Sequence, residues 1–469
     1  MKMPIYEMLK AYPSSNPLPF HMPGHLLGRG LSEELKIAGC LDITEIPGSD
    51  CLHHPQGVIR EAQELVAHLF GAGYSLFLVN GSTSGIHTMV QAVVKPGGKL
   101  IIGRDCHRSV LSALALINAE PIYVLPERDD ENQIPLGITE LALRKALSAH
   151  PDAQGILLTR PNYYGVAQPL EGISELARQY RIPLFVDEAH GAHFRFHKAF
   201  PDTALELGAD LCVQSLHKTL PALTQTALLH GNEKSLIARG VVEKVASMVQ
   251  TTSPSYLFMA SIDTARQMME DKGEILYEDL WQHITKFNEK LEQLPSIKRV
   301  ACCYDGYATD FSRIVLSFKN TQLSGFKAEE LLRVRYGVFA EMADLEHVVL
   351  IATPFHSSED FNRLFGALKA LSEEFKEETS AERKRVSWPN VLPERILTLR
   401  EALFHNGREL PIKEALGAIS AVSVIPYPPG IPLLNPGERI SSEFLGIIEA
   451  LMEENCPVHG ISQDKIQVI

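Results

Sequence analysis

The sequence is poor in cysteine, in long apolar runs and in positive charge. Its seven cysteines form none of the CxxC pairs that predict a zinc ribbon, and their odd, scattered spacing is typical of a reducing compartment. No stretch approaches the roughly 18 apolar residues of a membrane-spanning helix. The 44 Lys and Arg residues stand against 57 Asp and Glu, a net charge of −13. This argues against a general nucleic-acid or anionic-membrane surface, although it leaves room for a local phosphate pocket.

The 469 residues have the composition of an ordinary globular protein, with 45% hydrophobic and 22% charged residues. At about 150 residues per domain, this length predicts roughly three domains and allows a large buried core. The first 20 residues contain several prolines but no apolar stretch typical of a signal peptide. We therefore expect a cytoplasmic enzyme or a large binding protein.

Helical and extended patterns alternate between Gly57 and Leu229. An apolar stripe at helical spacing comes first, formed by Val58, Ala62, Leu65, Val66, Leu69 and Phe70. Apolar runs too short for helices follow at residues 74–79, 99–102, 121–125, 155–159, 183–186 and 211–214. Continuous apolar strands between helices predict an α/β fold, with a mostly parallel sheet that helices cover on both faces.

The second half of the chain indicates further units. A helical pattern covers residues 255–298, and strand patterns at 313–318 and 347–352 indicate a smaller α/β unit. The highly charged segment 372–385 is typical of a solvated helix or a linker. We expect an N-terminal segment with a large domain at residues 1–270, a small α/β domain at 271–385 and a C-terminal α+β domain at 386–469.

A first group of polar residues follows the apolar run at 74–79. It reads Gly81-Ser82-Thr83-Ser84-Gly85 and precedes a helical stretch that we expect to start at Ile86. Small residues let backbone N–H groups approach an anion, hydroxyls add donors, and a helix N-terminus adds positive potential. The GxxxxGK[ST] pattern of a P-loop is absent. The alternative interpretation is an ordinary Ser/Thr helix cap.

A second group, residues 187–193, follows the run at 183–186 and reads Asp-Glu-Ala-His-Gly-Ala-His. An acid directly after a buried parallel strand faces the crevice where α/β proteins bind ligands. Asp187 could therefore hold a cation, a metal or a protonated ring nitrogen. The positions scatter over a turn with no matching cluster elsewhere, so we expect no metal site. For His193 and His197 the alternative is a packed, hydrogen-bonded core histidine.

A third group, Ser215-Leu216-His217-Lys218-Thr219-Leu220, follows the run at 211–214. Solvated lysines usually lie on helix faces, whereas Lys218 follows a predicted strand. Cationic or apolar neighbours lower the pKa of a lysine amine and make it nucleophilic, which suits Schiff-base chemistry. The alternative is a lysine that binds a phosphate or lines a loop.

Together the three groups supply the parts that pyridoxal 5'-phosphate requires. Lys218 would form the imine with the cofactor aldehyde, and Asp187 would keep the pyridine nitrogen protonated. His107, which follows the run at 99–102, is expected to stack on the ring; the alternative is a helix-capping or surface histidine. The residues expected to hold the phosphate are Ser82, Thr83, Ser215 and His217.

The sequence resembles the bacterial ornithine/lysine/arginine decarboxylases over nearly its whole length. The motifs that carry the resemblance occur in the same order, at residues 20–25 (FHMPGH), 42–45 (DITE), 52–55 (LHHP), 79–83 (VNGST), 105–109 (DCHRS), 187–193, 214–220, 253–256 (SPSY) and 426–438. The resemblance implies the aspartate-aminotransferase fold (fold type I) and pyridoxal phosphate as cofactor. It also implies the roles given above for Lys218, Asp187 and His107, with His190 beside the ring.

The resemblance implies a homodimer or higher assembly as well, with active sites near the subunit interface and contributions from the segments around His25 and Pro428. Because the first motif begins near residue 21, the chain resembles the short form without an N-terminal wing domain, often linked to polyamine biosynthesis. Two positions depart from the family pattern. Leu26 stands where Lys is frequent, and Leu216 replaces a Thr whose hydroxyl would lie near the phosphate.

Decarboxylation of a basic amino acid is the function that the resemblance implies. Arginine, which would give agmatine, is favoured over lysine and ornithine, and a modified basic substrate stays open. His25 and Glu438 are the candidates to contact the substrate, Glu438 as the acidic partner of its distal cation. The alternative for Glu438 is a solvated turn glutamate.

Two other functions compete. An aminotransferase or lyase would share the cofactor cradle, and an aminotransferase would bind the substrate carboxylate through a small-domain arginine such as Arg313, Arg333 or Arg335. A non-enzymatic cofactor-binding regulator would be expected to lack Lys218 or Asp187, and the sequence contains both.

Overall fold

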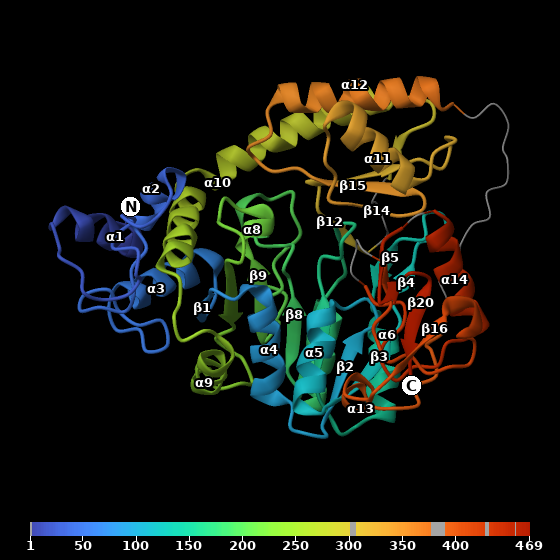
Figure 1. Ribbon diagram of the computed structural model, residues 1–469, viewed down its shortest axis with the longest axis horizontal. Helices are drawn as coiled ribbons and strands as arrows, with labels where there is room; N and C mark the ends of the chain where they lie inside the picture. Colours follow the sequence, from blue (N-terminus) through green and yellow to red (C-terminus); the bar gives the residue numbers. More distant parts are fainter. Residues whose placement is uncertain (1, 301–305, 377–389, 427–430, 455) are drawn as a thin grey trace. The chain divides into compact units, whose positions relative to one another are not determined.

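The computed structural model describes residues 2–300, 306–376, 390–426, 431–454 and 456–469 (Figure 1). The chain forms two compact units. Unit 1 comprises Met1–Val94, Gln154–Arg160 and Leu170–Ile275, and unit 2 comprises Lys95–Ala153, Pro161–Pro169 and Leu276–Ile469.

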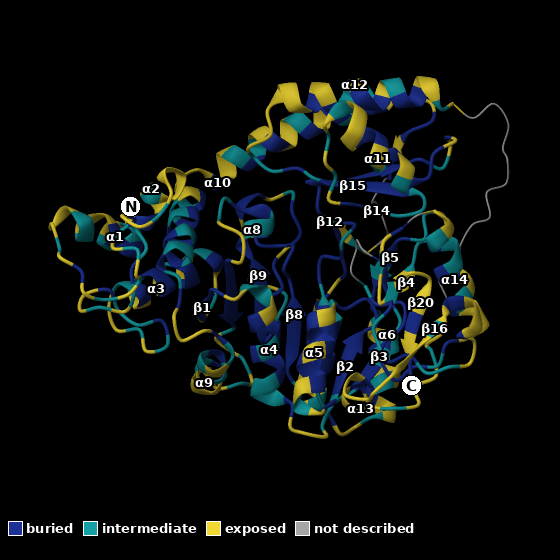
Figure 2. Cartoon of the chain, viewed as in Figure 1, coloured by how far each residue is buried: buried dark blue, intermediate teal, exposed yellow. Residues whose placement is uncertain are grey.

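Unit 1 is built on five buried strands in the order β1-β10-β9-β8-β6. They are β1 (Tyr74–Leu78), β10 (Ala227–Gly231), β9 (Leu211–Ser215), β8 (Leu184–Asp187) and β6 (Ala153–Thr159). Strands β9, β8 and β6 are parallel, and β10 is antiparallel to both of its neighbours. In Figure 2 the labelled strands β1, β8 and β9 are coloured as buried. Four of the five were predicted from the apolar runs of the sequence, whereas β10 was missed.

The helices of unit 1 are α1 (Pro4–Ser14), α2 (Glu33–Gly39), α3 (Val58–Phe70), α4 (Gly81–Val93), α7 (Glu171–Tyr180), α8 (Leu216–Thr219) and α9 (Arg239–Val249), with a 3-10 turn at Phe194–Phe196. The predicted stripe of α3 is partly confirmed, because Ala62, Val66 and Phe70 are buried whereas Leu65 and Leu69 are half-buried. Helix α4 packs against β9 and β10. A long helix, α10 (Tyr256–Leu291), begins in unit 1 and ends in unit 2.

Unit 2 begins with the parallel pair β2 (Lys99–Gly103) and β3 (Glu120–Val124), with helices α5 (Arg108–Ile117) and α6 (Glu140–Ala149). An antiparallel sheet follows in the order β11-β13-β15-β14, formed by Lys298–Arg299, Arg313–Ser317, His347–Ile351 and Met342–Ala343. Helices α11 (Gly325–Tyr336) and α12 (Ser358–Glu374) belong to this part, and a Ser357–Asp360 capping box starts α12. The short strands here are β4 (Glu127–Arg128), β5 (Pro135–Gly137), β7 (Val166–Ala167) and β12 (Ala308–Thr309).

The C-terminal part of unit 2 has its own apolar core, which includes Val424, Leu434, Phe444 and Ile448. Its elements are α13 (Leu399–Leu403), β16 (Arg408–Pro411), a 3-10 turn at Ile412–Glu414, β17 (Ile425–Pro426), α14 (Ser442–Glu453), β18 (Val458–His459), β19 (Ile461–Ser462) and β20 (Lys465–Val468). The α+β character expected for the C-terminus agrees with this mixture.

The two units do not coincide with the predicted domains. Unit 1 ends at Ile275, near the expected boundary after residue 270, but Lys95–Ala153 and Pro161–Pro169, which we expected in the large domain, belong to unit 2. Buried contacts explain this difference, because Arg104 pairs with Glu438 and α5 packs against α13. The expected boundary between residues 385 and 386 lies outside the described residues, so the three-domain division stays a prediction.

None of the helices in the described part of the chain combines the length and the apolar composition needed to cross a membrane.

Burial of His230 in β10 predicts a loss of stability in acid. Burial lowers the pKa of this ring to about 3. The unfolded chain therefore takes up a proton below pH 6.5, whereas the folded protein does not, and stability is lost as the pH falls from 6.5 towards 3. We expect His230 to account for about 2 kcal/mol of the difference in unfolding free energy between pH 7.5 and pH 5.

Urea unfolding at the two pH values measures this contribution. The difference between the pH values should shrink in His230→Gln but not in His405→Gln, which changes an exposed histidine. An equal pH dependence in wild type and His230→Gln would contradict the prediction.

Candidate active site

Lys218 lies immediately after the sheet of unit 1. Strand β9 ends at Ser215, and the single turn of α8 then carries His217 and Lys218, both half-buried. The Nζ atom of Lys218 is 3.1 Å from Nε2 of His190. The Nδ1 atom of His217 donates to the carbonyl of Thr226 at 3.0 Å. The structure therefore brings together Lys218 and His190, which the sequence had placed in two separate motifs.

Asp187 is the last residue of β8, and its side chain is buried. Its carboxylate accepts a hydrogen bond from the backbone N–H of Ala189 at 3.1 Å. The neighbouring strand is tied to the same turn, because the N–H of Ser215 donates to the carbonyl of Ala189 at 3.3 Å. Since β8 and β9 are parallel, Asp187 and Ser215 lie at the same edge of the sheet.

The Ser215 side chain is fully buried, and its hydroxyl has no hydrogen-bond partner within the residues that the structure describes. Leaving a buried hydroxyl unpaired costs about 1–3 kcal/mol. Such a group is explained when a ligand supplies the missing acceptor, so the Ser215 hydroxyl is suited to a bound anion.

The N-terminus of α4 lies at the same edge, because β1, which precedes it, runs in the same direction as β8 and β9. The helix begins at Gly81, five residues before the expected start at Ile86. Ser82 and Thr83 therefore belong to its first turn, where backbone N–H groups have no partner within the helix. Ser82 is half-buried and Thr83 is exposed.

Close packing of α4 on the sheet depends on Gly85. A Cβ atom at this position would lie 2.5 Å from Cγ2 of Val213 and 2.7 Å from Cδ1 of Leu78. Small residues in this segment were expected to let backbone N–H groups approach an anion. At Gly85 the missing side chain also permits close packing, which brings the N-terminus of α4 close to β9.

Charge states at this edge follow from burial. Burial is the main cause that lowers the pKa of His217, and the nearby charge of Lys218 lowers it further. A neutral His217 that donates from Nδ1 to Thr226 has an unprotonated Nε2, so it would donate to a phosphate only after taking up a proton.

The histidines at 193 and 197 are packed in the core. His193 is fully buried with its ring edge-on to Phe200, 4.4 Å between centroids, and His197 is buried against the same ring. Among the described residues, no group of three or more His, Cys, Asp or Glu side chains is arranged to hold a metal ion.

The remaining predicted residue of the cofactor site, His107, belongs to unit 2 and caps helix α5. Its Nδ1 accepts from the backbone N–H of Ser109 at 3.3 Å and lies 2.8 Å from the Ser109 hydroxyl. The capping interpretation that the sequence left open is therefore real. It uses only Nδ1, so it leaves the stacking role of the ring untested.

Glu438 is buried and not a solvated turn residue. Its two oxygens accept from the guanidinium of Arg104 at 2.6 and 2.8 Å, and the backbone N–H of Asn435 donates to it at 2.7 Å. The Arg104 guanidinium also lies over the ring of Tyr123. Because Arg104 already neutralises it, Glu438 presents no unpaired carboxylate, and the structure does not support the expected contact with a substrate cation.

His25 is held by its own segment in unit 1. Its Nε2 is 3.2 Å from the carboxylate of Asp42, and its Nδ1 accepts from the backbone N–H of Gly28 at 3.0 Å. The segment around Pro428 lies outside the described residues. The substrate and interface roles of both segments stay predictions.

The three small-domain arginines have different environments. Arg333 and Arg335 lie on α11 and form ion pairs with Glu329 and Glu374, whereas Arg313 is fully buried in β13. The carboxylate-binding role that the sequence left open for these three arginines stays a prediction.

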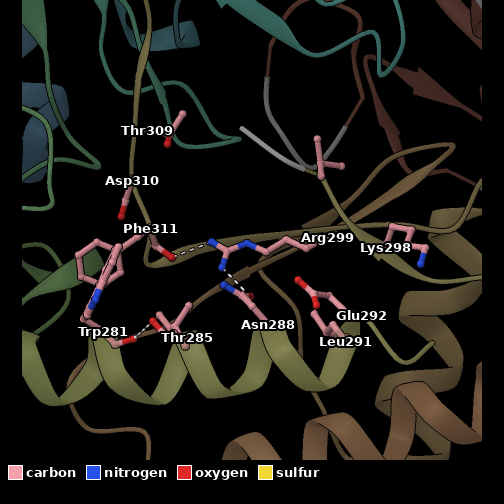
Figure 3. Close-up of a pocket in the computed structure, with 12 residues that line it drawn as sticks. Trp281, Thr285, Asn288, Leu291, Glu292, Lys298, Arg299, Thr309, Asp310 and Phe311 are labelled. Atoms are coloured by element: carbon pink, nitrogen blue, oxygen red, sulfur yellow. Dashed lines mark hydrogen bonds between the residues drawn. The ribbon is translucent and has the colours of Figure 1, made fainter. Parts of the chain in front are cut away.

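A cavity of about 410 Å³ in unit 2 contains none of the predicted site residues (Figure 3). Trp281 and Phe311 meet edge-on at its wall, 4.7 Å between centroids. Arg299 donates to the side chain of Asn288 and to the carbonyl of Phe311, both at 2.8 Å, as the dashed lines in Figure 3 show. Among the described residues that line this cavity, Arg299 has the only guanidinium, and it is already hydrogen-bonded, so we do not take the cavity as the active site.

Sequence reasoning missed Arg160, Gln214 and the role of Glu188. All three are buried, and the Glu188 carboxylate accepts a hydrogen bond from each of the other two side chains. Arg160 directly follows the predicted run at 155–159, and an arginine after a buried strand was a signal that could have drawn attention to it.

Comparison with known proteins places this site in a family. The major domain of the Orn/Lys/Arg decarboxylases matches residues 3–327, and their C-terminal domain matches residues 389–464. The chain is 37% identical over 99% of its length to "Arginine decarboxylase" of Bacillus subtilis, covering 97% of that protein. It is 36% identical to "Arginine decarboxylase" of Bacillus anthracis, covering 99% of this chain and 96% of the relative.

Solved structures show the same fold at lower identity. The lysine decarboxylase of Francisella novicida aligns with a TM-score of 0.85 and 21% identity, covering 99% of this chain and 81% of that one. The constitutive lysine decarboxylase of Escherichia coli aligns with a TM-score of 0.84 and 18% identity, covering 100% of this chain and 82% of that one. The predicted fold class, a fold-type-I α/β protein with a mostly parallel sheet, is thereby confirmed. With both domains matched along nearly its whole length, the chain belongs to the Orn/Lys/Arg decarboxylase family.

Proposed function

We propose that this amino-acid decarboxylase acts on L-arginine, releases CO₂ and agmatine for polyamine biosynthesis, and uses pyridoxal 5'-phosphate as its cofactor. The observation that carries the proposal is the contact of Lys218 with His190 at 3.1 Å. Asp187 lies at the same edge, as does the Ser215 hydroxyl, which has no partner among the described residues. A nucleophilic amine, a buried acid and an anion-binding hydroxyl are the groups that this cofactor requires.

The residues present fit the cofactor. Lys218 would bind its carbonyl carbon and Asp187 would pair with its ring nitrogen. The first turn of α4 offers backbone N–H groups to a phosphate, and the Ser215 hydroxyl lacks an acceptor that a phosphate oxygen would supply. The further residues proposed to contact the cofactor are Ser82, Thr83, His217, His190 and His107.

When bound, pyridoxal phosphate supplies a conjugated ring that accepts the electron pair left by departing CO₂. Asp187 favours this by stabilising positive charge at the ring nitrogen, because a buried carboxylate interacts strongly with a nearby cation. Lys218 must be neutral to act as a nucleophile, and His190 can hold the proton that its amine releases. The same two groups can return a proton to the substrate Cα.

The relatives support arginine. The chain is 35–37% identical to three proteins named arginine decarboxylase, with 99% of the chain covered in each. Its identity to the lysine decarboxylases of Pseudomonas aeruginosa and Escherichia coli is 23% and 22%. Since the distal group of the substrate is recognised by a few pocket residues, the more similar relatives weigh more than the shared fold.

The resemblance also supports a homodimer in the cytoplasm, which we propose as the working assembly. An aminotransferase or a lyase that shares the same cofactor cradle stays the alternative function.

Release of CO₂ from arginine, lysine and ornithine, each supplied separately to the purified protein with pyridoxal phosphate, tests the function. We expect kcat/KM for arginine to exceed that for the other two by at least about 100-fold, because unpaired polar groups at the distal site penalise the wrong substrate. Faster CO₂ release from lysine or from ornithine would contradict arginine and identify that amino acid as the substrate. Keto-acid formation without CO₂ would favour the aminotransferase.

Lys218→Ala should lower kcat by about 10³-fold or more, because the variant loses both the nucleophile and a proton carrier. It should also lack the visible absorbance band of the cofactor bound to wild type. Lys234→Ala, which removes an exposed lysine of the same unit, is the control and should keep both properties. A retained band and rate in Lys218→Ala would disprove the assignment.

Two substitutions of His107 separate its capping from its stacking role. His107→Asn keeps a good N-cap and loses the ring, whereas His107→Phe keeps an aromatic ring and loses the cap. If the ring stacks on the cofactor, the Asn variant should bind it about five- to tenfold more weakly with an unchanged Tm, and the Phe variant should show a lower Tm with near-normal affinity. If only the Phe variant bound the cofactor weakly, His107 would act through its helix cap and not by stacking on the cofactor.

A further inference from the structure

Glu188 is a buried acid that the proposed chemistry does not use. Its side chain is 0% exposed, and four groups contact its carboxylate. Oε1 accepts from Nη1 of Arg160 at 3.2 Å and from the backbone N–H of Ala204 at 2.8 Å. Oε2 accepts from Nε2 of Gln214 at 2.7 Å and contacts Sγ of Cys212 at 3.4 Å. The carboxylate is thus held from several directions.

These contacts join the ends of three neighbouring strands. Arg160 directly follows β6, Glu188 directly follows β8, and Gln214 lies on β9 one residue before Ser215. The backbone repeats the connection, because the N–H of Arg160 donates to the carbonyl of Asp187 at 2.9 Å. One side chain therefore links the strands that carry Asp187 and Ser215.

The polar chain continues towards the other strands. Nε2 of His230 donates to the side-chain carbonyl of Gln214 at 3.2 Å, and the Ser75 hydroxyl donates to Nδ1 of His230 at 2.7 Å. Every member is buried. A satisfied buried network of this kind holds each side chain in one orientation, because any rotation would leave a polar group unpaired.

Glu188 also supports the turn that carries His190. Its carbonyl accepts from the N–H of Gly191 at 2.9 Å and so closes the turn. A Cβ atom at Gly191 would lie 2.6 Å from Cγ of Glu188 and 3.0 Å from the ring of Phe194. The side chain of Glu188 therefore fills the space directly behind the turn, on which His190 reaches Lys218.

Packing alone does not explain why the side chains of Glu188 and Arg160 are ionisable groups. Burial raises the pKa of Glu188 and lowers that of Arg160, while the charge of each opposes the shift of the other. Apolar side chains of similar volume often fill such a space without a stability penalty. Unlike an apolar side chain, the Glu188 carboxylate makes four directional contacts, and these contacts fix the orientation of the turn.

We propose that Glu188 is a positioning residue, which with Arg160 and Gln214 holds Asp187 and His190 in register with Lys218. The inference rests on the proposed function, since it takes these residues as the cofactor-binding groups. The role requires that a change at Glu188 act on cofactor geometry more than a comparable change elsewhere in unit 1.

Glu188→Gln tests this role, and Asp263→Asn is the matched control. Asp263 is also a buried acid of unit 1, 3.2 Å from Arg266, and it accepts from the backbone N–H of Ile5. We expect Glu188→Gln to weaken cofactor binding about tenfold and to lower kcat about tenfold with KM changed less than about twofold. Asp263→Asn should lower the Tm while leaving cofactor affinity and kcat near wild type.

Gly191→Ala provides a second route if Glu188→Gln does not fold, because it displaces the turn and keeps the charged pair. It should weaken cofactor binding in the same direction. Equal cofactor affinity and kcat in Glu188→Gln and Asp263→Asn, or normal affinity in Gly191→Ala, would overturn the proposal. Failure of wild type to release CO₂ from arginine would refute the proposed substrate, whereas the comparison of cofactor affinities would still decide the role of Glu188.

Discussion

The common direction of β1, β8 and β9 is the constraint on which the candidate site depends. Parallel strands end at one edge of a sheet, so the groups that follow them meet there although they lie far apart in sequence. The N-terminus of α4, Asp187 and Ser215 owe their common location to this geometry. Strand β10 runs the other way and starts at that edge, where the carbonyl of the preceding Thr226 accepts a hydrogen bond from His217.

A second layer of polar contacts lies behind this edge. At the edge itself, the buried Ser215 hydroxyl has no hydrogen-bond partner among the residues that the structure describes, as expected of a group that binds a ligand. Behind it, the buried Glu188 carboxylate accepts hydrogen bonds from the side chains of Gln214 and Arg160. A rigid support of this kind holds the residues at the edge in the orientation that a ligand needs.

The fold of this family does not by itself determine which basic amino acid is the substrate. Lysine decarboxylases at about 20% identity share this fold, so the fold does not distinguish lysine from arginine. Both substrates present the same α-amino and α-carboxylate groups to the cofactor and differ only in their distal cation. Glu438 illustrates the difficulty, because its sequence position suggested recognition of that cation whereas its carboxylate is already bonded to Arg104.

By itself the sequence determined the α/β class, four of the five strands of unit 1 and the three polar groups that follow them, because hydrophobic period and strand-end residues are local properties. It also carried the family motifs. Only the tertiary structure decided which groups meet, as in the 3.1 Å contact between Lys218 and His190, and which are already bonded, as in Arg104 with Glu438. It also showed that His107 caps α5 and that the buried Glu188 accepts hydrogen bonds from Arg160 and Gln214. A carboxylate or an imidazole has the same letter in the sequence whether it is free or paired, and its partner is set by long-range packing.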